Sequence, residues 1–190
     1  MTAQSSDAES DPRGRRQLSL SERDSSPFGA FLRNGPDDWG RPVALADRGP
    51  DDGFAALRFD ATPGSVTRTR SFLRSTLTNW QLPELVDDAT TIAAELVANA
   101  VTHALGSSRA PRDAEAEAAW LALVREDRSV VCAVADPSPA LPAMHEPELF
   151  AESGRGLHIV AELSETWGHA RTEGPWPTGK TVWARLSSGR

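Results

Sequence analysis

The stretch Glu95-Leu-Val-Ala-Asn99-Ala-Val-Thr-His103 decides how the rest of this sequence is interpreted. On a helix its apolar residues cover a broad face, whereas Glu95, Asn99 and His103 form one stripe at i, i+4 and i+8. A helix that is mostly apolar is buried, and a buried carboxylate without a partner is strongly disfavoured. We therefore expect the stripe to face a polar cavity or a bound ligand.

A plainer interpretation of the stripe is also open. Glu95 and His103 would then form an exposed pair on the rim of the helix, and Asn99 would be a hydrogen-bonded core amide. The functional interpretation has its own chemical basis. An amide carbonyl oxygen can ligate Mg²⁺ without adding charge, and a carboxylate one turn away can orient or deprotonate a nucleophile.

Helices and strands are predicted on both sides of this stretch. Proline at a first helical position and glycine after the last turn set the helix limits, and short apolar runs with turn residues between them indicate strands. The amphipathic helices and the strands predict an α+β domain. The expected elements are a strand at 54–59, helices at 62–79 and 83–105, a hairpin of strands at 118–125 and 129–135, a helix at 154–163, and strands at 166–171 and 181–186.

Two weaker motifs follow the helix. Asp136 stands where an apolar run ends, and a carboxylate there can accept a hydrogen bond from the exocyclic amine of adenine, although an ordinary Asp-Pro turn is the alternative. Gly154-Arg155-Gly156 precedes a helix, so the backbone can approach a phosphate and Arg155 can add a charge-assisted contact. Residues 136–153 contain four prolines and are expected to form a lid.

Composition limits the domain organisation. The 190 residues, 39% of them hydrophobic, suffice for one cored domain at 53–190. Residues 1–52 are rich in Ser, Asp, Arg, Gly and Pro and are expected to be a mostly disordered tail. Apolar side chains interrupt this tail, and some of them could dock on the domain or on a partner. Among them are Phe28, Phe31, Leu32 and Trp39.

Charge and apolar content exclude other classes. A net charge of -7 argues against a nucleic-acid-binding surface, because phosphate contacts need clustered basic residues. No apolar run approaches the roughly 20 residues that cross a bilayer, so we expect neither membrane insertion nor secretion. The single cysteine, Cys132, lies in an apolar run and is expected to be a core residue, which fits a reducing cytoplasm.

The stripe, the strand-end aspartate and the glycine turn occur in an order that resembles the GHKL ATPase superfamily. Within it the sequence looks like the stand-alone anti-sigma-factor serine kinases and their actinobacterial relatives. The similarity covers about residues 54–186. The segments that also match are Trp80-Gln-Leu-Pro, Trp167-Gly168 and Gly179-Lys-Thr-Val-Trp183.

The resemblance implies a Bergerat-type two-layer α/β sandwich. A mixed, mostly antiparallel sheet would carry helices on one face, with ATP between the sheet and the helix that bears Asn99. Asn99 would bind Mg²⁺, Glu95 would act as the base and Asp136 would bind the adenine amino group. Gly154, Gly156 and Leu157 would form the hinge of the phosphate lid. To these we add Arg155 for its charge, and we also expect His103, Ser138 and Thr181 to bind ATP.

The resemblance also implies a function. The protein would be a cytoplasmic kinase that transfers the γ-phosphoryl group of ATP to a serine or threonine of an anti-anti-sigma partner, and its ATP-bound form would hold a sigma factor; homodimerisation is possible. One departure favours a second hypothesis, a nucleotide-dependent binding module without catalysis. The superfamily's Asp-x-Gly-x-Gly is here Asp136-Pro-Ser-Pro-Ala140, in which two prolines fix φ where glycines would be flexible.

Overall fold

The computed structural model describes residues 53–62, 64–105, 118–143, 155–172 and 179–189. The predicted tail at 1–52, most of the predicted lid, and Gly154 lie outside the described residues. The elements are β1 (Phe54–Phe59), α3 (Gly64–Asn79), the 3₁₀ turn η2 (Pro83–Leu85), α4 (Val86–Ala100), the π turn η3 (Val101–Leu105), β2 (Ala119–Glu126), β3 (Ser129–Asp136), α5 (Gly156–Leu163), β4 (Thr166–Thr172) and β5 (Gly179–Ser187).

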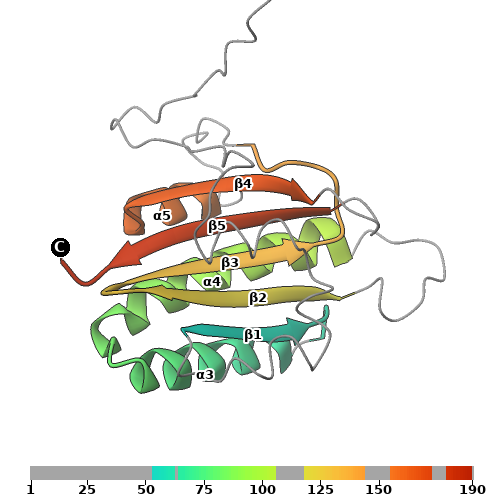
Figure 1. Ribbon diagram of the computed structural model, residues 1–190. Coiled ribbons are helices and arrows are strands. Elements are labelled where there is room, and N and C mark those ends of the chain that lie inside the picture. The colour runs from blue at the N-terminus through green and yellow to red at the C-terminus, as the bar shows by residue number, and fades with distance from the viewer. Residues whose placement is uncertain (1–52, 63, 106–117, 144–154, 173–178, 190) are drawn as a thin grey trace, which may run out of the picture.

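The five strands form one sheet in the order β1-β2-β3-β5-β4. Each of the four pairings between described strands is antiparallel, whereas the resemblance implied a mixed sheet. The predicted hairpin of β2 and β3 is confirmed, with Glu126 opposite Ser129 across the turn. Figure 1 shows α3, α4 and α5 on the same side of the sheet. The expected α+β two-layer sandwich is therefore confirmed.

The core lies between the helices and the sheet. Alternate residues of each strand point toward the helices, and in β3 these are Val130, Cys132 and Val134, none more than 1% exposed. Leu73 and Leu77 of α3 and the apolar face of α4 close this layer. Cys132 is fully buried, which confirms it as a core residue, and this burial raises the pKa of its thiol to about 12.

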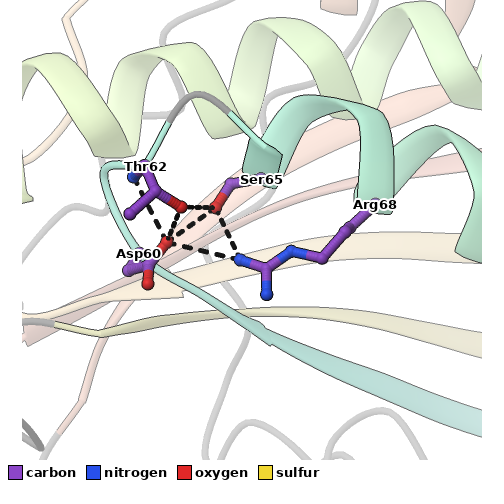
Figure 2. A network of polar contacts seen from close by, with 4 residues as sticks. All are labelled: Asp60, Thr62, Ser65 and Arg68. Carbon is purple, nitrogen blue, oxygen red and sulfur yellow. Dashed lines mark hydrogen bonds and ion pairs between the residues drawn. The ribbon is translucent and has the colours of Figure 1, made fainter.

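A carboxylate organises the connection between β1 and α3 (Figure 2). Asp60 Oδ1 accepts hydrogen bonds from the backbone N–H of Thr62 at 3.2 Å and from Ser65 Oγ at 2.8 Å, and Arg68 Nη2 lies 3.4 Å away. Hydrogen bonds from Thr62 and Ser65 lower the pKa of Asp60 to about 2. The sequence predicted that this helix starts at residue 62. In the structure α3 begins at Gly64, and Asp60 accepts the hydrogen bonds of the residues before and at its first turn.

The single helix predicted at 83–105 is three consecutive helical segments, η2, α4 and η3. Pro83 stands in the first turn of η2, where its missing N–H costs no intrahelical hydrogen bond. At the other end the chain widens into a π turn that carries His103, and such turns are frequent at functional sites. None of the helices in the described ranges is long and apolar enough to cross a membrane.

The helix-to-sheet core is tested by Leu73→Ala. Leu73 is fully buried, so truncation removes its burial and leaves a cavity. The free energy of unfolding should fall by about 2–5 kcal/mol in urea titrations. Ser71→Ala, at an exposed position of the same helix, should change it by no more than about 0.5 kcal/mol. Similar values for the two variants would contradict the assigned core.

Candidate functional site

The polar stripe of α4 lies at the edge of the core rather than inside it. Glu95 and Asn99 are half-buried and His103, in the π turn, is exposed. Their apolar neighbours Leu96, Val97 and Ala100 are at most 2% exposed. Packing of these neighbours fixes the rotation of the helix, and this rotation turns Glu95 and Asn99 away from the centre of the core.

The carboxylate of Glu95 lies against the first residue of α5. A Cβ built on Gly156 would stand only 2.7 Å from Glu95 Oε2, so any larger side chain at this position would displace the carboxylate. The first-turn N–H groups of a helix lack intrahelical acceptors and carry partial positive charge. The start of α5 therefore brings backbone donors to the carboxylate end of the stripe. Leu157 is buried beside it and Arg155 is exposed.

A buried ion pair lies at the end of β3. Lys180 Nζ is 2.9 Å from Asp136 Oδ1, and the two side chains are only 9% and 3% exposed. Their residues are direct partners in the register of β5 and β3. The backbone N–H of Ser138 donates to the same Oδ1 at 2.9 Å, so Asp136 closes a tight turn through Pro137.

Burial affects the pKa of Asp136 more than these hydrogen-bond donors do. Desolvation raises the pKa of Asp136, although the hydrogen bond and charge of Lys180, the N–H of Ser138 and the charge of His103 each oppose the rise. The influence of His103 brings the last member of the α4 stripe into the electrostatic environment of Asp136. The Ser138 side chain itself turns to its own loop, where Oγ accepts from the N–H of Ala140 at 3.3 Å.

Thr181 is not brought together with these residues. Side chains of β5 alternate between the two faces of the sheet, and Val182 and Ala184 face the helices. Lys180 therefore faces the helix side with Asp136, while the buried Thr181 faces the opposite side with Trp183. Lys180 is the site residue that the sequence interpretation missed. The sequence did distinguish Lys180, because it is the only lysine in the chain and immediately precedes an apolar run.

Close backbone packing joins β3 and β5 at this end. A Cβ on Gly179 would lie 2.5 Å from the carbonyl oxygen of Asp136, so glycine is required for the approach. The stripe of α4 links the two halves of the site, since Glu95 stands beside Gly156 and His103 is near Asp136. Eight residues of helix rise about 12 Å, so an elongated ligand could contact both ends.

The raised pKa of Asp136 predicts a pH dependence. The folded state favours the neutral carboxyl, so its contribution to stability is complete below the ordinary pKa of 3.8 and is lost as pH rises through the folded value. Asp136→Asn lacks this titration. The free energy of unfolding of wild type minus variant, from urea titrations, should therefore decrease from about pH 3 to about pH 7. A difference that increases would mean that Lys180 outweighs desolvation.

The chain matches a known family of protein domains. The model of the histidine kinase-like ATPase domain matches residues 59–186, more than half of the 190-residue chain. The matched region includes both ends of the site, from Glu95 to Lys180. The comparison with curated proteins found no match. The chain belongs to the histidine kinase-like ATPase domain family, which is of the ATP-binding GHKL type.

Proposed function

We propose that this protein is a serine/threonine kinase of the anti-sigma-factor type, which uses ATP with Mg²⁺ to phosphorylate an anti-anti-sigma partner. The observation that carries the proposal is the Glu95 carboxylate against Gly156, one helical turn from Asn99. A base, an amide metal ligand and the N-terminus of a helix then stand together at one end of the site. Those are the groups that phosphoryl transfer to a hydroxyl requires.

The residues present fit the nucleotide at both ends. At the end of the site that would hold adenine, Asp136 Oδ1 accepts hydrogen bonds from Lys180 and Ser138. Its other oxygen, Oδ2, is left to accept from the adenine amino group. At the phosphate end, Gly156 gives the backbone room for a close approach, and Asn99 offers a neutral oxygen to Mg²⁺. Arg155 is exposed beside this end and can meet phosphate charge from solvent.

ATP would supply the phosphoryl group to be transferred, with Mg²⁺ balancing its negative charge. The work of the chain is then to position groups and to move one proton. Glu95 would accept the proton of the partner's serine or threonine hydroxyl as its oxygen bonds to the γ-phosphorus, while the bond from that phosphorus to the β–γ bridging oxygen breaks and ADP leaves. Asn99 would hold the metal, and the backbone at Gly156 and Leu157 would hold the phosphates. The partner pair, a sigma factor and its antagonist, is part of this proposal, as are the cytoplasmic location and a homodimer.

The turn after β3 favours a second candidate, a nucleotide-dependent binding module that does not catalyse transfer. Pro137 and Pro139 fix φ on either side of Ser138, whose N–H is held by Asp136. This segment is stiff where the superfamily motif has glycines. ATP would then act by favouring one partner-binding conformation over another.

Asn99→Ala and Glu95→Gln separate the two candidates. Calorimetry with ATP and Mg²⁺ should give at least about a tenfold weaker affinity for Asn99→Ala, because a metal ligand is lost. Glu95→Gln should bind ATP normally but transfer labelled γ-phosphate to the native host's anti-anti-sigma proteins about 10²–10⁴-fold more slowly. Thr102→Ala, exposed in the same helical run, is the control. Binding without transfer in the wild type would favour the module.

Gly156→Ala tests the placement of Glu95. The added methyl group displaces only the far end of a flexible side chain, and alanine suits a helix better than glycine. The free energy of unfolding should therefore stay within about 1 kcal/mol of wild type, while γ-phosphate transfer falls by about tenfold or more. Unchanged transfer in a normally folded Gly156→Ala protein would show that the position of the Glu95 carboxylate is not used.

A further inference from the structure

The sheet face turned away from α3, α4 and α5, here called the outer face, is apolar. It carries a second hydrophobic cluster whose members all come from strands. Register explains the cluster, because opposed residues in a sheet share a face: Ala56 pairs with Ala122, Ala122 with Ala133 and Ala133 with Trp183. The buried members are Ala122, Val124, Val131, Ala133, Ala135 and Trp183, flanked by Phe54, Ala56 and Trp120.

The central side chains of this face have little solvent exposure. Trp183 is 3% exposed, Val124 and Val131 are 2% exposed, and Ala133 is fully buried. Side chains on a sheet stand roughly perpendicular to it, so neighbours on the same sheet cover their flanks and not their tops. The helices that the structure describes pack on the other face (Figure 1). The described helices therefore leave the outer face to another segment or partner.

We propose that residues 1–52 dock on the outer face and bury Trp183 and its alanine-lined surroundings. This segment joins the sheet at the margin of the face, because Gly53 O accepts from the N–H of Arg125 and Phe54, the next residue, belongs to the outer cluster. It also carries large apolar side chains in a mostly polar sequence, among them Phe28, Phe31, Leu32 and Trp39.

The segment is long enough. Trp39 is 14 residues from Gly53, which allows a span of up to about 46 Å. From β1 to β5 is three strand spacings, or about 14 Å. The small side chains of Ala56, Ala122 and Ala133 leave room between the flanking aromatic residues for such side chains to pack. By contrast, residues 106–117 contain no apolar side chain larger than alanine or proline.

The proposal is tested on the full chain with a nitroxide on Ala30→Cys. Buried Cys132, with its pKa raised to about 12, should not react at neutral pH and can stay in place. In ¹⁵N-enriched protein the label should remove most of the indole N–H intensity of the outer-face residues Trp183 and Trp120. It should spare Trp80 and Trp167, which lie on the helix side. Each signal is assigned from a Trp→Phe variant.

Matched variants make the result specific. Adding Phe31→Asp and Trp39→Asp to the labelled chain should restore the Trp183 and Trp120 signals, whereas Ser25→Asp with Ser26→Asp should leave them weakened. A label on Ser71→Cys, exposed on α3, should show no preference for the outer pair. Equal loss at all four indoles, or none, would overturn the proposal. So would loss that appears only when labelled chains are mixed with enriched, unlabelled ones, because the cover would then be a second copy.

Discussion

Packing of α4 against the inner face of the sheet is the constraint on which the rest of the domain depends. The helix contacts α3, α5 and β3 at once, and its residues Ile92, Ala93 and Val97 are at most 1% exposed. Interiors packed this closely leave little freedom to rotate or slide a helix. The half-buried positions of Glu95 and Asn99 follow from that fixed rotation, since one residue of slip would turn the stripe by about 100°. Side chains on a packed helix such as α4 are held more precisely than side chains on a loop, which favours the helix as the place for Glu95 and Asn99.

The carboxylates at the two ends of the site are stabilised in different ways. At the α5 end, Glu95 keeps part of its exposure and no pairing cation is needed. At the β3 end, Asp136 and Lys180 are both buried, where desolvation costs each ion several kcal/mol and removal of one partner leaves an uncompensated charge. The pair therefore acts as a unit. Any group that binds Asp136 must do so beside the ammonium of Lys180, which fixes the direction of the remaining oxygen.

Periodicity in the sequence predicted most of the fold. The stripe of Glu95, Asn99 and His103 and the apolar strands have strong 3.6- and 2-residue patterns, and the elements lie within a few residues of their expected bounds. Two of the unpredicted features depend on pairing between distant residues. Lys180 and not Thr181 faces Asp136 because of the register of β5, and the alternation that decides this cannot be phased from the sequence alone. The apolar outer face was hidden for a related reason, since a strand buried on both sides shows no alternation.

Lys180 is the only lysine in the sequence, and this has a chemical consequence. Lysine side chains are where cells attach acetyl, methyl and ubiquitin-like groups, and this chain of 190 residues carries only one. Its ammonium is held by Asp136 at 2.9 Å, between strands joined by the tight backbone contact at Gly179. Lys180 can be acylated only after the end of the β3–β5 pair opens and the amine loses its proton. Acylation of this amine would therefore record how often that end of the sheet opens.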